Sequence, residues 1–450
     1  MNLRHSPLRT VVSVAASASI MATSLVAIAA PVITTAATTC VEETGSTTVY
    51  PALVAGQPAY QASVTAQPAW PTGQKLGCDV NLRATGSGSG KTDLITYVNA
   101  APGAGTRRDL AASSSPLSGT ESPTLMAFQV GGDAMVIAVR NDNPVTSIKM
   151  AEVTAIYNGN ISTWDQISAP NGKTGAIVVR SRIAGSGTRD DMNRLFKMDR
   201  GTVDAAGHKV SCSAGFTTCE PDVIDASGQA RLTTSAEEAD AVCNSSSAIV
   251  YTSLANLQLY GPGTAGCDAA GHTLKALNLQ LTDYATFTGA TLNNPLSLPS
   301  SGAFVAPSVS SAAVSGTYPA KRALFLTMGK VAKLATKYGT GNGTGWTDDL
   351  NTTKAFDLVN YMGSTQGQSS VAGVGFINIS VPSKQLVPDA DVDLNGGIGL
   401  TDIGQITGRW NRTDTIPGSI RADVDNNGGV GLSDIGKITG AWGTTGFVAP

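Results

Sequence analysis

The chain has 450 residues, of which 14% are charged and 5% aromatic, and its formal net charge is −3. Without the basic excess typical of nucleic-acid-binding proteins, we expect no nucleic-acid partner. The three histidines, His5, His208 and His272, are far apart in sequence, which argues against a multi-histidine metal centre or a histidine-based catalytic triad. The 42% hydrophobic residues are enough for folded cores, and the length suggests two or three domains.

The N-terminal segment has the pattern of an export signal. Arg4, His5 and Arg9 precede an apolar stretch rich in Ala and Ser, and Ala27-Ile28-Ala29 fits a small-x-small cleavage site. We therefore expect residues 1–30 to be a signal peptide and the mature chain to be exported, to a periplasm, the cell surface or the medium. A membrane anchor and lipidation at Cys40 stay open as alternatives.

Six cysteines in an exported chain favour disulfides. No CxxC spacing indicates a metal site, and few histidines are present to activate a thiol nucleophile. Pairing each cysteine with its nearest neighbour in sequence predicts the bonds Cys40–Cys78, Cys212–Cys219 and Cys243–Cys267.

Three loops rich in Gly and in Ser or Thr each precede a stretch that can be helical. The loops are Gly45–Pro51, Gly86–Lys91 and Arg182–Arg189. Such a loop presents backbone N–H groups and the positive end of a helix to an anion, and an arginine adds a charge-assisted contact. A single glycine-rich loop is usually only a turn, but three in one chain indicate an anion site. The second loop lacks P-loop spacing. The expected helices are 52–60, 92–98 and 190–196.

Two further sequence segments accompany these loops. Asp133–Val139 is a strand-like run, and Ile156–Trp164 reads Ile-Tyr-Asn-Gly-Asn-Ile-Ser-Thr-Trp ahead of the Gly-Ser-Gly-Thr-Arg of the third loop. In this order, residues 41–385 resemble the substrate-binding protein of the bacterial high-affinity phosphate ABC importer. The resemblance implies a two-lobed α/β fold of the type II periplasmic-binding-protein kind, with a hinge and a ligand enclosed between the lobes. The implied lobes are 41–130 with 304–385, and 131–303, with hinge strands near Gly132 and Ala303.

The same resemblance implies a binding protein rather than an enzyme. Its ligand would be inorganic phosphate or a related oxyanion, and its partner a separate ABC permease. Two other functions stay open. One is a secreted phosphatase-like enzyme on this scaffold, and the other is a component attached to a larger scaffold. The implied ligand-binding residues are Thr47, Thr48, Ser89, Ser114, Arg182, Ser186, Gly187 and Thr188.

Two positions depart from the family pattern. Ser114 stands where the family has an aspartate that accepts the proton of hydrogen phosphate, and Ala184 stands where family members can carry an aspartate that pairs with the arginine. Losing both carboxylates would remove negative charge near the anion. We therefore predict that the site tolerates an unprotonated dianion such as sulfate.

The C-terminal part contains a duplicated twelve-residue loop. The copies are 391–402 and 423–434, and oxygen-bearing side chains occupy positions 1, 3, 5 and 12. Glycine at position 6 allows a sharp turn, and position 7 offers a carbonyl, which suits the oxygen-seeking Ca²⁺. The sequence therefore predicts two Ca²⁺ sites. Their predicted ligands are Asp391, Asp393, Asn395, Gly397 and Asp402, and Asp423, Asp425, Asn427, Gly429 and Asp434.

Apolar residues at helical spacing follow each loop, so we expect one loop and one helix per copy. Residues 389–445 resemble a type I dockerin, a small α-helical module that binds a cohesin. The resemblance implies that a cohesin-like partner would contact Leu400-Thr401 and Leu432-Ser433. The alternative is a Ca²⁺-stabilised tail without a partner.

Overall fold

The computed structural model describes most of the chain after residue 40. The predicted signal peptide and the four cysteines Cys40, Cys78, Cys212 and Cys219 lie outside the described residues. Within the described part, no helix combines the length and the apolar character needed to cross a membrane. The described residues are 41–62, 79–157, 159–168, 172–196, 202–203, 209–211, 230–283, 295–313, 315–338, 349–379, 386, 388–413, 420–425, 427 and 429–444.

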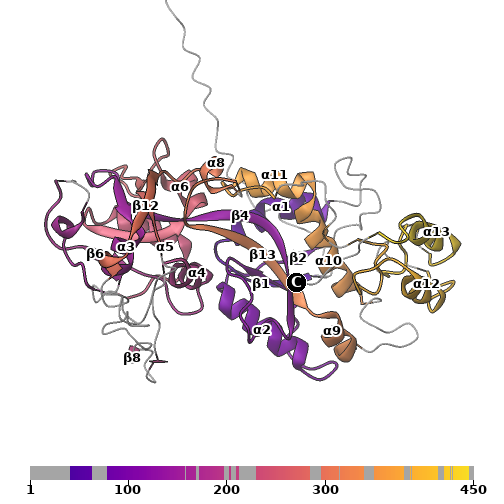
Figure 1. Cartoon of the computed structure of the whole chain (residues 1–450). Helices are drawn as coiled ribbons and strands as arrows, with labels where there is room; N and C mark the ends of the chain where they lie inside the picture. Colours follow the sequence, from indigo (N-terminus) through magenta and orange to yellow (C-terminus); the bar gives the residue numbers. More distant parts are fainter. Residues whose placement is uncertain are drawn as a thin grey trace, which may run out of the picture. The chain divides into compact units, whose positions relative to one another are not determined.

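One large mixed sheet organises residues 41–379 (Figure 1). Its strand order is β2-β1-β3-β13-β4-β9-β6, and β10 pairs with β4. β1 runs parallel to β2 and β3, whereas β13 is antiparallel to β3 and β4. Together with the helices on the sheet, this confirms the α/β class. The strands are β1 Val41–Gly45, β2 Val80–Asn81, β3 Leu110–Ser113, β4 Leu125–Arg140, β6 Val178–Arg180, β9 Ala248–Ser253, β10 Leu274–Ala276 and β13 Lys321–Gly329.

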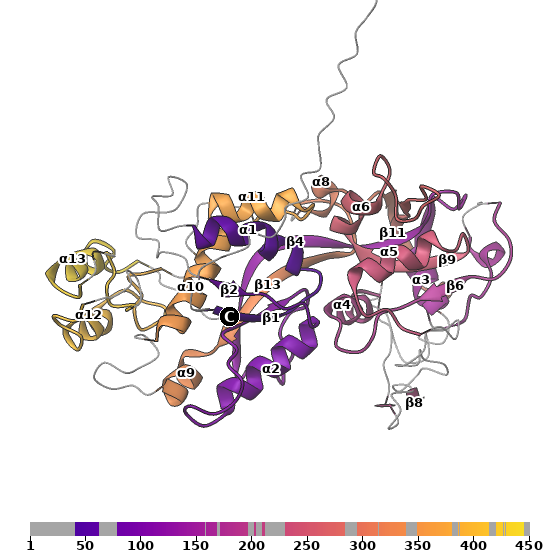
Figure 2. The same cartoon turned by 180° about the vertical axis from the view of Figure 1, so that it is seen from behind.

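Two apolar cores divide this part of the chain into lobe 1 and lobe 2. Figure 2 shows α1 and α11 of lobe 1 side by side. The helices of lobe 1 are α1 Tyr50–Gln61, α2 Ser87–Asn99, α9 Val331–Tyr338, α10 Leu350–Gly363 and α11 Thr365–Gly373. The helices of lobe 2 are α3 Met150–Tyr157, α4 Gly187–Leu195, α5 Ser235–Cys243, α6 Leu254–Tyr260 and α8 Val309–Ala312, with 3-10 turns Trp164–Gln166 and Pro295–Ser297. Lobe 2 also has the strands β5 Ser147–Lys149, β11 Asn278–Thr282 and β12 Ser300–Val305, and a short pair β7 Thr202–Val203 and β8 Lys209–Ser211 is separate.

The long strand β4 belongs to both cores. Its first part pairs with β13, and its last six residues pair with β9 and β10. Val130 lies in the core of lobe 1 and Met135 in the core of lobe 2. Between them, Gly132 exchanges two backbone hydrogen bonds with Ile377, of 2.7 and 2.8 Å. The first crossing between the lobes therefore lies at Gly132.

The second crossing lies later in the chain than the sequence predicted. We expected it near Ala303, but β12 pairs with β11 inside lobe 2, and Tyr318 and Ala320 are in the core of lobe 2. The chain returns to lobe 1 only along β13, from Lys321. β12 is a short, largely exposed strand with the sequence Ser-Ser-Gly-Ala-Phe-Val. Its pairing with β11 depends on the tertiary structure, so the sequence did not show that the chain is still in lobe 2 at this point.

A buried ion pair joins the two crossing strands. Asp133 of β4 accepts hydrogen bonds from Nε and Nη2 of Arg322 on β13, at 2.8 and 2.6 Å, and from the backbone N–H of Leu254 at 3.0 Å. Asp191 of α4 lies 3.8 Å from the same guanidinium. These side chains are fully buried, and a buried charge is tolerated only when it is paired. The network therefore fixes both crossing strands against α4 and α6.

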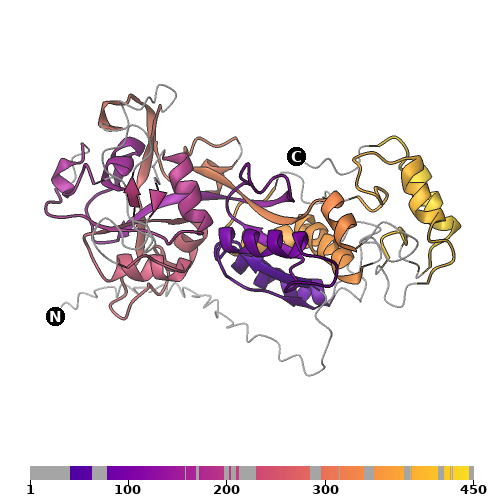
Figure 3. The same ribbon diagram turned by 90° about the horizontal axis from the view of Figure 1, so that it is seen from below.

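Most buried apolar residues of the C-terminal part form a cluster of their own, which runs from Val392 to Ile438. It contains two helices, α12 Leu400–Thr407 and α13 Leu432–Gly440, each of which begins inside a predicted Ca²⁺ loop. Figure 1 shows these yellow helices beside each other, and Figure 3 views them from below, where they overlap. The prediction of one loop and one helix per copy is confirmed.

A carboxyl group is buried at the base of the first glycine-rich loop. Glu43 of β1 accepts a hydrogen bond from the N–H of Ala112 on β3 at 3.1 Å and one from the N–H of Arg83 at 3.3 Å. Burial raises the pKa of Glu43 from 4.5 to about 8, against the lowering effect of these hydrogen bonds. Glu43 thus holds three neighbouring segments together beneath the loop.

We predict that Glu43 makes the stability of the chain depend on pH. Its folded pKa lies above its unfolded value, so its contribution is complete below pH 4.5 and is lost as the pH rises towards 8. Glu43→Gln imitates the protonated form and should gain stability over the unmodified chain across this range, by at most about 5 kcal/mol at the alkaline end. Urea unfolding at several pH values measures the difference. A constant difference would contradict the prediction, and Glu42→Gln serves as the neighbouring control.

Candidate functional site

Three helix N-termini meet where the two lobes touch. The helices are α1, α2 and α4, and each begins inside one of the three predicted anion-binding loops. The second of these predictions is largely wrong, because residues 87–91, predicted as loop, are the first residues of α2. Thr48 and Thr188 share a hydrogen bond between their hydroxyl groups at 3.0 Å, and the N–H of Gly88 donates to the carbonyl of Gly185 at 2.8 Å. Helix N-termini carry partial positive charge, so their convergence creates a region suited to an anion.

The lobes approach so closely that one position admits only glycine. A β-carbon on Gly187 would lie 2.3 Å from Oγ of Ser87 and 2.6 Å from Oγ of Ser114. A similar approach occurs inside lobe 1, where a β-carbon on Gly90 would lie 2.5 Å from Cα of Gly45. Because these separations are far below normal contact distances, any side chain at position 187 would push the lobes apart.

The structure gathers all eight predicted ligand-binding residues at this junction. Besides the contacts above, Ser114 donates its N–H to Oγ of Ser87 at 3.1 Å, and Ser186 caps α4 by accepting from the N–H of Arg189. Ser89 is exposed and lies beside Gly185, where a β-carbon would be 3.5 Å from its Oγ. Segments far apart in sequence thus supply hydroxyl groups to one place.

Arg182 links the lobes across this junction. Its Nη2 donates to Oγ1 of Thr47 at 3.1 Å and to the carbonyl of Thr233 at 2.9 Å, and its Nε donates to the carbonyl of Leu232 at 3.2 Å. The side chain is 1% exposed, so the guanidinium is held in one orientation. The predicted binding arginine therefore lies at the site, next to a predicted hydroxyl of the other lobe.

Glu238 is the functional residue that the sequence reasoning missed. It pairs with Nη1 of Arg182, and its other carboxylate oxygen accepts from the hydroxyl of Thr252 and, at 3.1 Å, from the amide of Asn256. Burial raises the pKa of Glu238, and the nearby Arg182 opposes this shift.

The prediction that the chain lacks negative charge beside Arg182 is therefore wrong. Ala184, where an aspartate was missing, is exposed, and the pairing carboxylate comes from α5 instead. A signal was present in the sequence, because Glu238 shares the buried face of α5 with Ala239 and Val242. A charged residue at such an apolar position requires a partner of opposite charge.

The disulfide Cys243–Cys267 is present and fixes the end of α5 to the segment before β10. The predicted pairing of these two cysteines is confirmed. It anchors the helix that carries Glu238.

A cavity of about 520 Å³ lies at the crossing strands. Its lining includes Gly132, Arg194, Arg322, Phe325 and Ile377. Among the described residues that line it, none belongs to the eight predicted ligand contacts. The cavity is therefore a feature of the hinge region, separate from the junction of the helix N-termini.

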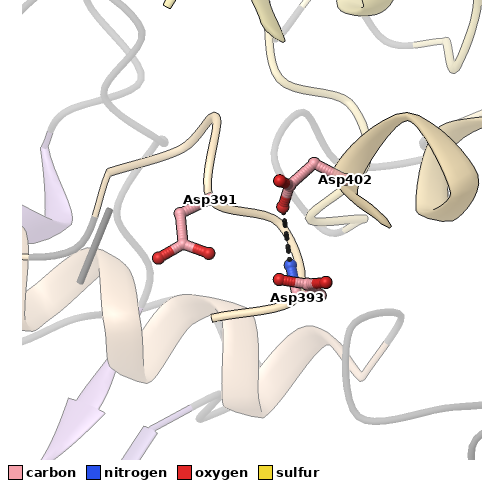
Figure 4. Close-up of side chains that lie close together, drawn as sticks. All are labelled: Asp391, Asp393 and Asp402. Carbon is pink, nitrogen blue, oxygen red and sulfur yellow. Dashed lines mark hydrogen bonds between the residues drawn. The ribbon is translucent and has the colours of Figure 1, made fainter. Parts of the chain in front are cut away.

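The duplicated loops of the C-terminal part gather carboxylates in two matching clusters. In the first, one oxygen from each of Asp391, Asp393 and Asp402 lies within 4.8 Å of the others (Figure 4). Asp402 accepts hydrogen bonds from the N–H groups of Asp393, at 3.2 Å, and Gly399, at 2.8 Å. Burial raises the pKa of Asp402, as does the neighbouring charge of Asp393.

The second loop repeats this arrangement with Asp423, Asp425 and Asp434. The N–H groups of Asp425 and Gly431 donate to Asp434 at 3.1 and 2.8 Å. The remaining predicted ligands lie on the same turns, because Asn395 accepts from Gly397 and Asn427 accepts from Gly429, at 2.9 and 3.0 Å. An all-oxygen donor set with crowded, partly buried carboxylates fits a hard divalent cation.

Backbone hydrogen bonds couple the two loops to each other. The N–H of Gly443, after α13, donates to the carbonyl of Ile398 in the first loop at 3.1 Å. The N–H of Asn411, after α12, donates to Val430 in the second loop at 3.0 Å. Asn411 and Gly443 both have positive φ, of 62° and 71°, so the repeats share their conformation as well as their sequence.

Comparison with known proteins gives one family and several similar structures. The family model of the PBP superfamily domain matches residues 6–340. A substrate-binding protein assigned to a phosphate ABC transporter of Clostridium perfringens, solved with bound phosphate, is 18% identical with a TM-score of 0.48; the alignment covers 76% of this chain and 99% of that one. An ABC-type phosphate transport receptor from Vibrio cholerae is 18% identical with a TM-score of 0.45, covering 75% and 100%. No curated protein matches the chain.

We predict that removing the Glu238 carboxylate destabilises the fold. Glu238→Ala leaves Arg182 buried without its partner, which should lower the free energy of unfolding by about 3–5 kcal/mol. Glu238→Gln retains hydrogen-bonding capacity and should cost less. Urea unfolding measures both, with Asp240→Ala on the exposed face of α5 as control. If Glu238→Ala unfolded like the control, Arg182 would not depend on this pair.

Proposed function

Because this chain belongs to the PBP superfamily, we propose that it is an exported solute-binding protein that captures phosphate or a related tetrahedral oxyanion between its two lobes. The main support for this proposal is a set of direct contacts between the two lobes. Thr47 and Thr48 of lobe 1 contact Arg182 and Thr188 of lobe 2 directly. Donors from both lobes therefore meet at one point, which is the geometry that a ligand closing two lobes requires.

The residues present favour binding by neutral donors and one charge. Backbone N–H groups at the starts of α2 and α4, together with threonine and serine hydroxyls, would surround the anion. Arg182 would add a charge-assisted contact. Its pairing with Glu238 holds the guanidinium in place before a ligand arrives, so less ordering is needed on binding.

Ser114 supports relaxed specificity among oxyanions. A hydroxyl can donate to an oxyanion or accept its proton, whereas an ionised aspartate can only accept. Glu238 does not replace the missing acceptor, because its buried carboxylate is paired with the Arg182 guanidinium and also accepts from Thr252 and Asn256. The site would thus bind phosphate without strong rejection of sulfate.

Binding rather than catalysis fits the surroundings of the loop hydroxyls. Among the described residues, the hydroxyl of Thr48 shares a hydrogen bond with that of Thr188, and Ser186 accepts from a backbone N–H. An activated nucleophile would instead hydrogen-bond to a base such as His or a carboxylate. We therefore propose that the chain is not an enzyme and that it delivers its ligand to a separate ABC permease.

Calorimetric titration of the mature chain with phosphate, sulfate, molybdate and tungstate tests the proposed specificity. We expect measurable binding of both phosphate and sulfate. Ser114→Asp should weaken sulfate binding by at least about tenfold through charge repulsion, and phosphate much less. Ser369→Asp, on the exposed surface of α11, is the matched control. If the unmodified chain bound phosphate but not sulfate, the prediction that it accepts both anions would be wrong. If it bound no oxyanion, the proposed function would be wrong.

We further propose that the two C-terminal loops each bind Ca²⁺. Asp391, Asp393, Asn395 and Asp402 would supply side-chain oxygens in the first loop, with the carbonyl of Gly397. The second loop would use its equivalents. Bound Ca²⁺ would supply the positive charge that lets these carboxylates lie close together.

A cohesin-like partner of the C-terminal part stays a prediction. Leu400 and Leu432, at equivalent positions of the two copies, are each 75% exposed. Large apolar side chains with this exposure are available for contact with another protein. Thr401 and Ser433 each accept a hydrogen bond from the loop asparagine of their own copy.

We predict that each loop accounts for one Ca²⁺. Asp402→Asn and Asp434→Asn should each reduce the stoichiometry from two to one, because each removes the carboxylate at position 12 of one loop. Calorimetry on chelator-treated protein measures the number of ions. Asp165→Asn, an exposed change in lobe 2, should leave both ions bound. A stoichiometry that neither loop variant changes would place the ions elsewhere.

A further inference from the structure

Two residues of the C-terminal repeats that contact lobe 1, Leu394 and Arg421, have no identical counterpart in the other copy. Position 4 of the loop is Leu394 in the first copy and Asn426 in the second. Two residues before the loop, the first copy has Asp389 and the second has Arg421. Both copies keep the hydrogen bonds that their position-12 aspartate accepts and the helix that follows the loop. Leu394 and Arg421 are the differing residues that contact lobe 1.

Leu394 packs into the core of lobe 1. It is 7% exposed and belongs to the same apolar cluster as Phe356 of α10, with Leu386 packed against that cluster. Its φ of 55° lies in the left-handed region, which a bulky side chain rarely adopts. Such a conformation persists only when the surroundings hold it. The loop therefore presents this leucine to lobe 1 at a conformational cost.

Arg421 reaches the same place from the second repeat. Its guanidinium lies 5.3 Å from the ring centre of Phe356, within the range of a cation–π contact. Its Nη2 donates to the carbonyl of Pro388 at 2.8 Å and to that of Asp391 at 3.0 Å. One buried side chain thus connects α10, the segment before the first loop, and the first residue of that loop.

We propose that the first C-terminal loop and α10 of lobe 1 form one interface, through which a divalent cation bound in that loop stabilises lobe 1. The cation would fix the backbone conformation that directs Leu394 into the core of lobe 1. A ligand that binds only the docked form favours that form by mass action. This inference rests on the proposed Ca²⁺ sites and assigns the first loop a role that the second does not share.

Hydrogen exchange of the full-length protein tests this interface. We expect Ca²⁺, compared with chelator, to slow amide exchange in α10 by at least about tenfold, because exchange reports local opening. α5 of lobe 2 should not respond. Leu394→Asn, which gives the first loop the residue of the second, should abolish the slowing. The matched variant Leu400→Asn changes an exposed leucine of the same repeat and should preserve it.

Calorimetry with Ca²⁺ on the same samples separates the two proposals. Ca²⁺ binding without slower exchange in α10 would overturn the interface while leaving the metal sites intact, as would equal slowing in both leucine variants. In chelator alone, Leu394→Asn should speed exchange in α10 relative to Leu400→Asn, which tests the interface without any cation. Faster exchange there combined with no Ca²⁺ binding would support the contact and overturn the cation's role.

Discussion

The junction of the lobes depends on a backbone approach that only glycine permits. At Gly187 a β-carbon would collide with Ser87 and Ser114, so the N-terminus of α4 can lie against the loops of lobe 1 only because no side chain intervenes. Short backbone distances bring N–H groups and small hydroxyls together in place of long charged side chains. A chain with 50 glycines and 14% charged residues is consistent with a site built in this way.

Buried charges connect that junction to the crossing strands. Arg182 is neutralised by Glu238, and Arg322 by Asp133, so neither guanidinium is left unpaired in a low-dielectric interior. Helix α4 takes part in both places. Its N-terminus contributes Gly187 to the junction, while Asp191, one turn later, lies 3.8 Å from Arg322 on the crossing strand β13. A movement of the crossing strands would therefore displace Arg322 relative to Asp191 and so affect the position of α4.

The two C-terminal repeats keep the same loop geometry but differ where the first of them meets lobe 1. Both loops arrange their aspartates in the same way, which indicates the same chemistry. The copies differ where the first loop meets lobe 1, at Leu394 and Arg421. A duplicated sequence can thus keep its ligands and still diverge at the few positions that pack against a different neighbour.

The sequence by itself determined the features that depend on neighbouring residues. The helices beside the glycine-rich segments and the duplicated acidic loops with their helices could be read from local patterns, because each depends on short-range geometry. The exact helix starts could not, since residues 87–91 were predicted as a loop and belong to α2. The Cys243–Cys267 pair was predicted only from the rule that each cysteine pairs with its neighbour in sequence. Only the tertiary structure decided the partners of buried groups. Glu238 lies 56 residues from Arg182, and the exposed strand β12 is assigned to lobe 2 only by its pairing with β11. Such pairings depend on which segments fold side by side, and a single sequence records burial and its required partner only indirectly.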